Sequence, residues 1–467
     1  MREKYRQLAG NTLVFAVGSF GTRLILFFLL PVYTYGLSAG EYGTFELINT
    51  LSLLAVPVLS GAIHHAVLRY GLDCTEKPEE VLKSAAAVLA AGGVLTLILT
   101  PFLRYSAVLA PYRWLFAGSV LAEMTAQTFL TYLKATGRSG LFVFLGLVQT
   151  GLLALLNLLF LPGLHLGLQG CLLAGVLSGG AAALLALLAG RLLPVLRCFR
   201  LQRKLLFRML AYSLPLIVSQ MAWWIIESSD KVMVNHILGS EALGLYSVAC
   251  RIPALLNVFI ALFSQAWKIS AFREYDQGQD RRFYGTAFRI FTVTVGLACS
   301  CIMLVLRPFL RIYVGQTFYE AWRFVPCLLL ASVFSSISVF MGAIYGSLQN
   351  SVHEMLSVLL TGGLNIALNL ALIPRMGIQG AAGATAISYL FIAAFRILDT
   401  RRYFRFPIRF SLLAAQLLIL TGIGYFVTVF PGGWIAAALG IPLLVLLNRD
   451  LMKAAAVELR KVGKWKR

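Results

Sequence analysis

Four charged side chains lie in the two apolar arms of a hairpin, residues 212–253, that is long enough to cross a membrane twice. Glu227, Asp230 and Lys231 fall in its first arm and Arg251 in its second. Ionised groups are costly in hydrocarbon, so they usually face a bundle interior or a wet cavity and serve a function there. The hairpin is therefore predicted to line a polar cavity.

Two further charges, Arg23 and Glu123, lie near the membrane midplane, about 17 and 14 Å from the expected starts of their helices at about 1.5 Å per residue. An arginine offers a planar fork that binds phosphate oxygens in pairs, which suits a pyrophosphate. An ion pair between Arg23 and Glu123 that only ties two helices together is the alternative. For the hairpin, the alternative is a satisfied network of Glu227, Lys231 and Arg251 near the outer mouth.

The face of the first arm indicates two further kinds of contact. Glu227, Asp230 and Lys231 are three or four residues apart and share one helix face. Gln220, Trp223 and Trp224 lie deeper on the same arm, where they could hydrogen-bond and stack on sugars, although a membrane tryptophan is more often a packing residue or an interface anchor. The carboxylates of Glu123, Glu227 and Asp230 are candidates to take up a proton or a sodium ion and couple its gradient to transport.

The elements that carry these residues are membrane helices. Of the 467 residues 59% are hydrophobic and 13% charged, and the mean hydropathy is +0.82. Apolar runs of about 20 residues recur along the chain and are continuous rather than alternating, which predicts an all-α polytopic membrane protein. We expect about fourteen helices, near residues 11–35, 44–68, 82–103, 113–135, 140–161, 168–191, 209–237, 243–267, 286–306, 320–347, 352–373, 380–398, 409–430 and 433–448.

The charge distribution predicts the orientation. The net charge is +21, and most of the 40 lysines and arginines fall in alternate segments, for example residues 191–208 and 396–409. An excess of positive charge marks the cytoplasmic side, so both termini are predicted to be cytoplasmic in the cell (inner) membrane. The charge then reflects topology and attraction to anionic membrane lipids rather than binding of nucleic acid.

The sequence also contains a duplication. The motif Asn157–Pro162 with Gly167–Gly170 returns as Asn369–Pro374 with Gly377–Gly380, and two further motifs repeat at a similar offset of about 200 residues. Six helices per copy make the copies parallel, which is a transporter architecture. The expected organisation is a six-helix lobe at 1–193, a basic amphipathic linker at 194–208, a second six-helix lobe at 209–400, and two extra helices with a basic tail at 401–467.

These motifs resemble a known family. The turn LSAGEYGTFEL at residues 37–47 and the hairpin pattern YSLP…SSDKV…ILG…GLYSVA at 212–249 are similar to the oligosaccharide-lipid (O-antigen-type) flippases of the polysaccharide transporter family. Their superfamily also holds lipid II flippases and multidrug/sodium antiporters. The resemblance implies a V-shaped fold of two lobes that moves a polyprenyl-pyrophosphate-linked oligosaccharide to the outer leaflet by alternating access, for envelope or exopolysaccharide synthesis. Related lipid II flippases hold the pyrophosphate with arginines on the first and eighth helices, where Arg23 and Arg251 stand here.

Other functions remain as alternatives. A multidrug/sodium antiporter belongs to the same superfamily. A lipid II flippase fits less well, because the three buried cations are matched by three anions. A membrane glycosyltransferase or polymerase would need a long outer loop, which is missing. The sequence contains no P-loop and no metal-type cysteine spacing. We therefore expect a monomeric non-enzyme without metal or cofactor, driven by membrane potential or by a proton or sodium gradient.

Overall fold

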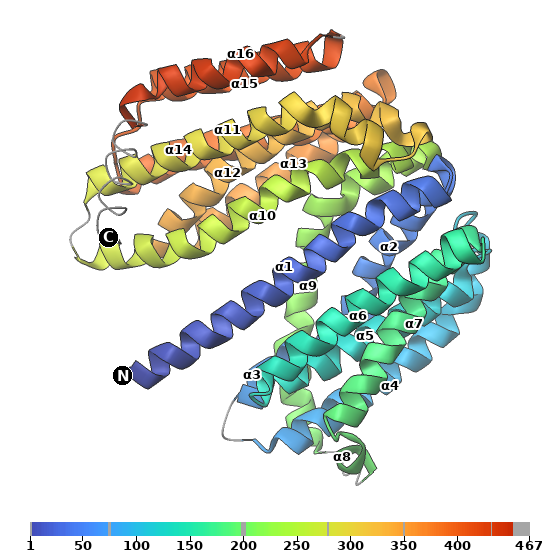
Figure 1. Ribbon diagram of the computed structural model, residues 1–467. Helices are drawn as coiled ribbons and strands as arrows, with labels where there is room; N and C mark the ends of the chain where they lie inside the picture. Colours follow the sequence, from blue (N-terminus) through green and yellow to red (C-terminus); the bar gives the residue numbers. More distant parts are fainter. Residues whose placement is uncertain are drawn as a thin grey trace, which may run out of the picture. The chain divides into compact units, whose positions relative to one another are not determined.

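The computed structural model describes residues 2–72, 76–197, 202–277, 280–348, 351–430 and 432–451. In these ranges the secondary structure is helical throughout, which confirms the all-α prediction. The chain divides into two compact units (Figure 1). Unit 1 holds residues 1–235 and 239–244, and unit 2 holds residues 236–238 and 245–467.

Unit 1 is built around α5, which packs against six other helical elements of the unit. Figure 1 shows α5, α6 and α7 side by side, with α4 along their edge. The helices of this unit are α1 (Arg2–Gly36), α2 (Ala39–Leu59), α3 (Ile63–Leu72), α4 (Pro78–Leu99), α5 (Arg113–Ala135), α6 (Ser139–Leu158), α7 (Gly167–Ala189), α8 (Leu193–Arg197) and α9 (Arg203–Leu238), with a 3-10 turn η1 (Thr100–Tyr105) and a π-helical turn η2 (Leu159–Gly163).

Unit 2 has α12 at its centre, in contact with α11, α13, α14 and α15. Figure 1 shows α15 and α16 lying along α11. The helices that enter or form this unit are α10 (Ser240–Gln277), α11 (Arg281–Tyr313), α12 (Val325–Ser347), α13 (Ser351–Met376), α14 (Ile378–Tyr403), α15 (Phe410–Val429) and α16 (Trp434–Leu447), with a 3-10 turn η3 (Gln316–Arg323).

The helix lengths confirm a multi-pass membrane protein. Among the described residues, eleven helices are long and apolar enough to cross a bilayer. Two shorter apolar stretches, Phe20–Gly36 in α1 and Trp434–Leu447 in α16, coincide with the expected first and last spans. The remaining expected span, at 113–135, is the 23-residue helix α5.

The second expected helix, at 44–68, is interrupted in the structure. It begins earlier, at Ala39, because the Ser38 hydroxyl accepts a hydrogen bond from the Glu41 amide (3.3 Å) and the Glu41 carboxylate accepts one from the Ser38 amide (2.9 Å). This capping box satisfies amides at the start of the helix. The helix then breaks at Gly61 and Ala62, whose φ angles are 61° and 47°. This local left-handed turn separates α2 from α3.

The duplicated motif adopts a similar packing in each copy. A Cβ on Gly170 would lie 2.9 Å from the Cβ of Phe160, and a Cβ on Gly380 would lie 2.3 Å from the carbonyl oxygen of Leu372. In both copies, therefore, the glycine that ends the motif lets a helix start press against the end of the preceding span. Only glycine leaves room for such an approach.

The first of the two extra helices, α15, is tied into unit 2 by hydrogen bonds to backbone carbonyls. Gln416 of α15 donates from Nε2 to the Thr292 carbonyl (2.7 Å), and Arg307 of α11 donates to the Val427 carbonyl (2.6 Å). Of the expected linker at 194–208, residues 198–201 lie outside the described residues, and α9 already begins at Arg203. The expected basic tail after residue 451 also lies outside the described residues.

Candidate functional site

In unit 1, α9 is held along α2 and α3 at three levels by polar side-chain contacts. Near its start, the Tyr70 hydroxyl donates to the Arg208 carbonyl (3.4 Å). Near its middle, Trp224 donates from Nε1 to the Thr50 carbonyl (2.8 Å). Near its end, Lys231 pairs with a carboxylate of α2. This arrangement fixes which face of α9 packs on α2 and which face stays open.

The carboxylate that pairs with Lys231 is Glu46, which sequence reasoning missed. The Lys231 Nζ lies 3.0 Å from Glu46 Oε2, and the Tyr42 hydroxyl donates to Glu46 Oε1 at 3.0 Å. Glu46 is 3% exposed, so both oxygens of a buried carboxylate are occupied by protein donors. Buried charges are stable only when paired and hydrogen-bonded in this way. The available signal was an acidic residue inside the apolar run Phe45–Ile48 of the quoted turn motif.

The other two acidic residues of the predicted cluster have different surroundings. Asp230 is half-buried, and its Oδ1 accepts a hydrogen bond from the Lys231 amide (2.8 Å). Glu227 is exposed on α9. Of the predicted cluster, the structure thus pairs Lys231 with Glu46, while Glu227 is an exposed side chain one turn earlier on the same helix.

The aromatic and amide residues of α9 also divide between the two faces. Trp224 uses its indole N–H on α2, as a packing residue does, whereas Trp223 is 57% exposed. The Gln220 Nε2 is buried and has no hydrogen-bond partner within the described part of the chain. A buried donor without a partner is costly. Of these three residues, Trp223 has an exposed ring and Gln220 has an amide donor without a hydrogen-bond partner among the described residues.

Arg23 and Glu123 do not form the ion pair considered as an alternative. Arg23 is exposed on α1 and makes no hydrogen bond or ion pair with the residues that the structure describes. Glu123 of α5 is exposed and accepts a hydrogen bond from Gln149 Nε2 of α6 (3.4 Å). The ion pair that would tie Arg23 to Glu123 is therefore not formed in this structure. The Arg23 guanidinium remains available for an anionic ligand.

Arg251 belongs to the other unit. It lies on α10, is half-buried, and is close enough to α11 for its charge to act on the Tyr313 hydroxyl. Arg251 thus lies in the neighbourhood of the Tyr313 phenol within unit 2.

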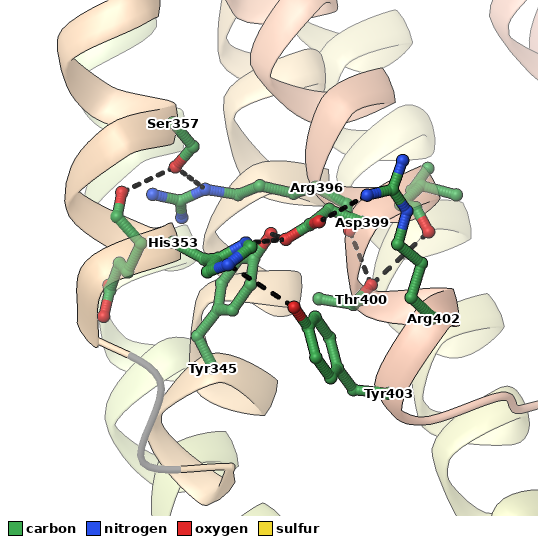
Figure 2. A network of polar contacts seen from close by, with 10 residues as sticks. Tyr345, His353, Ser357, Arg396, Asp399, Thr400, Arg402 and Tyr403 are labelled. Atoms are coloured by element: carbon green, nitrogen blue, oxygen red, sulfur yellow. Dashed lines mark hydrogen bonds and ion pairs between the residues drawn. The ribbon is translucent and has the colours of Figure 1, made fainter.

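Unit 2 contains a second buried polar network, which sequence reasoning also missed (Figure 2). Asp399 of α14 is 6% exposed, and its Oδ2 accepts hydrogen bonds from the Tyr345 hydroxyl (2.7 Å) and lies 2.9 Å from His353 Nδ1. Arg402 approaches Oδ1 at 4.0 Å. Because Tyr345, His353 and Asp399 stand near the ends of α12, α13 and α14, the network clamps three helix ends together.

Arg396 stands one turn before Asp399 in α14 and extends the clamp. Its Nε donates to the Ser357 hydroxyl (3.0 Å) and its NH1 to the Ser338 carbonyl (3.0 Å). Arg396 is 6% exposed, and the negative charge of Glu354 acts on its guanidinium. Sequence reasoning treated it only as one of the inner-segment cations.

We expect Asp399→Asn to lower the melting temperature of the purified chain in detergent by several degrees. The amide cannot accept as strongly from Tyr345 and His353, and loss of a hydrogen bond to a buried charged group costs about 1.5–3 kcal/mol. Scanning fluorimetry against Glu241→Gln, a change at an exposed acid, is the measurement. Equal melting temperatures for both variants would show that Asp399 does not hold the three helix ends.

The sequence matches two known families. The family described as "Polysaccharide biosynthesis protein" matches residues 8–268, which is more than half of the chain. The chain belongs to this family. A second family, MatE, matches residues 215–371. The search of curated proteins returned no significant match.

Solved structures show which fold this member of the polysaccharide biosynthesis family adopts. The lipid II flippase MurJ in an inward closed conformation is similar over 94% of this chain and 100% of that chain, with a TM-score of 0.66 and 13% identity. An inward-facing multidrug resistance MATE family transporter is similar over 84% of this chain and 96% of that chain, with a TM-score of 0.68 and 17% identity. A MOP-superfamily transporter from Pyrococcus furiosus is similar over 84% of this chain and 93% of that chain, with a TM-score of 0.55 and 15% identity. The chain therefore has the fold of the MOP-superfamily transporters and flippases.

Proposed function

We propose that this protein moves a polyprenyl-pyrophosphate-linked oligosaccharide from the inner to the outer leaflet of the cell membrane during polysaccharide synthesis. The observation that carries the proposal is Arg23, an exposed guanidinium on a membrane helix that no described residue pairs with, in a member of a polysaccharide biosynthesis family. Such a group binds a pyrophosphate in pairs of hydrogen bonds. Arg251, from the second repeat, is its proposed counterpart.

The substrate's sugar would meet the open face of α9. Trp223 offers an exposed indole for a pyranose face, and the unpaired Gln220 amide donor, which is buried in this structure, would reach a sugar hydroxyl once it is uncovered. Lys231 and Trp224, which were predicted to touch substrate, already have protein partners in Glu46 and Thr50. We assign them the role of holding α9 in place, from which it presents the other two.

Transport would proceed by alternating access. The two six-helix lobes, 1–193 and 209–400, would rock about the linker at 194–208, with the helices of 401–467 following the second lobe. The side chains of Glu123 and Glu227 are exposed, whereas Asp230 accepts a hydrogen bond from the Lys231 amide, so the first two are the proposed ion-coupling carboxylates. We propose membrane potential or such an ion as the driving force for a monomer with cytoplasmic termini.

We expect Arg23→Gln and Arg251→Gln each to lower polysaccharide export by about 10- to 100-fold, the equivalent of one lost charge-assisted interaction. Export is measured as surface polysaccharide in a strain that depends on the introduced gene, with membrane protein levels checked alongside. Arg375→Gln, at an exposed arginine of α13, is the matched control. Wild-type export in both variants would contradict the phosphate-holding role.

A multidrug antiporter is the second candidate, because the MatE family matches residues 215–371. It predicts that deletion of the gene sensitises cells to cationic drugs while surface polysaccharide stays unchanged. The proposed function predicts the reverse pattern.

A further inference from the structure

A basic cavity in unit 2 contains none of the residues assigned to substrate, to ion coupling or to the Asp399 network. It has a volume of about 290 Å³. Its walls come from the first third of α11, the start of α15 and the segment that follows α16. Because α11 begins at Arg281, α15 begins at Phe410 and α16 ends at Leu447, the cavity lies where three membrane helices end, at the level of a membrane surface.

The charged lining of the cavity consists of three arginines, two of which contact the carboxylate of Asp450. The arginines are Arg282, Arg289 and Arg409, and all three line the cavity. Arg289 donates to both oxygens of Asp450, at 2.7 and 2.6 Å, and Arg409 donates to Oδ2 at 3.2 Å. Hydrogen bonding to Arg289 holds the pKa of the Asp450 carboxyl below its usual range. The cavity therefore keeps a net positive charge even with this carboxylate bound.

The geometry of the Asp450 contacts is that of an anion site. Two guanidinium groups converge on one carboxylate, and one of them does so with the paired hydrogen bonds that arginine also makes to phosphate. Asp450 itself is about half exposed, at 52% of its side chain, so its place can be reached from outside. The Arg282 guanidinium makes no ion pair within the described ranges and adds a further positive charge at the rim.

The rest of the lining distinguishes the kind of anion. The polar side chains are held by the protein: Gln416 donates to the Thr292 carbonyl, and Asn448 accepts from Arg289 Nε at 3.1 Å. The remaining wall is apolar and is formed by Phe288, Pro407, Ile408, Leu412, Leu413 and Leu451. An arginine rim above an apolar wall at a membrane surface suits a phosphodiester joined to acyl chains better than a soluble anion.

We propose that this cavity binds the headgroup of an anionic phospholipid, and that Asp450 occupies the arginines as an internal substitute until the lipid phosphodiester displaces it. Basic pockets between membrane helices commonly take acidic lipid headgroups. This lipid site is distinct from the proposed binding site of the transported substrate, because Arg23 and Arg251 do not line the cavity. The proposed exchange also makes the strength of lipid binding depend on a single carboxylate.

The test measures lipid-dependent thermal stability of the full chain purified in a mild detergent. Titrations use short-chain phosphatidylglycerol, short-chain phosphatidylcholine and inorganic phosphate. We expect a saturable rise in melting temperature with phosphatidylglycerol only. Asp450→Asn should tighten the apparent Kd for phosphatidylglycerol about fivefold, since the competing carboxylate is gone, and Arg409→Gln should weaken it about tenfold, since a charge-assisted hydrogen bond is lost.

Arg409→Gln leaves the paired hydrogen bonds between Arg289 and Asp450 intact. Lipid binding can therefore still be measured in this variant if Asp450→Asn fails to fold. Arg375→Gln is the control outside the cavity and should bind as the wild type does. Equal stabilisation by phosphatidylcholine, or unchanged binding in Arg409→Gln, would overturn the site. Equal stabilisation by inorganic phosphate would overturn its assignment to a lipid.

Discussion

Replacing Lys231 with methionine is expected to destabilise the protein more than replacing Lys231 and Glu46 together. The single change leaves a carboxylate that is 3% exposed without its cation. Breaking a buried ion pair by removing one partner typically costs about 3–5 kcal/mol, whereas replacing both partners with neutral groups is often close to neutral. We therefore expect Lys231→Met to melt well below wild type and Glu46→Gln/Lys231→Met to recover most of the loss.

The measurement is a double-mutant cycle of melting temperatures in detergent, with Glu46→Gln as the fourth corner. Lys268→Met serves as the control, because Lys268 is exposed at the end of its span. If the single and double variants melt alike and no lower than the control, the ion pair does not hold α9 against α2. Loss of coupling would also remove the reason to assign Lys231 a positioning role rather than a substrate contact.

Substituting Gly43 with alanine is expected to be strongly disruptive although the change adds one methyl group. A Cβ at Gly43 would lie 1.7 Å from the carbonyl oxygen of Ser240, and a Cβ at Gly244 would lie 2.1 Å from that of Ala39. These four residues form two small-x-x-x-small pairs at equivalent positions of the repeat, so the starts of α2 and α10 cross with their backbones in contact. A backbone carbonyl cannot move aside as the end of a flexible side chain can.

We expect Gly43→Ala to lower the melting temperature strongly, since overpacking costs about 1–3 kcal/mol and more where the backbone must separate. Gly40→Ala is a matched control in the same turn, because its Cβ would meet only the Ser240 hydroxyl at 3.5 Å, an ordinary contact. If Gly43→Ala is as stable and as active as Gly40→Ala, then the close crossing is not required.

The fold class could be predicted from the sequence because continuous apolar runs of membrane length admit only helices. The turn at residues 37–47 was also recognised as a motif, but its need for glycine could not be, because that need depends on the close approach of Gly43 to Ser240, nearly 200 residues away. The break between α2 and α3 escaped prediction because Ala62 adopts a left-handed φ that its side chain does not favour.

The candidate site was predicted less completely than the fold. Sequence spacing placed Lys231 on one helix face with Glu227. Spacing identifies only neighbours along the same helix, so it could not reveal a partner on another helix. The ion pair of Lys231 with Glu46 joins α9 to α2 and depends on tertiary packing. The same holds for Asp399, whose partners Tyr345 and His353 come from two other helices. Arg23 was a candidate from its depth and from the family resemblance, and the structure adds that it is exposed.

The most direct test of the central proposal is translocation in proteoliposomes that contain only the purified protein and a polyprenyl-pyrophosphate oligosaccharide with a fluorescent sugar. An impermeant quencher is added outside, with and without an imposed membrane potential, proton gradient or sodium gradient. We expect wild-type protein to let the quencher reach the label from both leaflets, and we expect Arg23→Gln to leave the inner-leaflet label protected, as protein-free vesicles do. Protection of the inner-leaflet label with wild-type protein under every gradient would contradict the proposal.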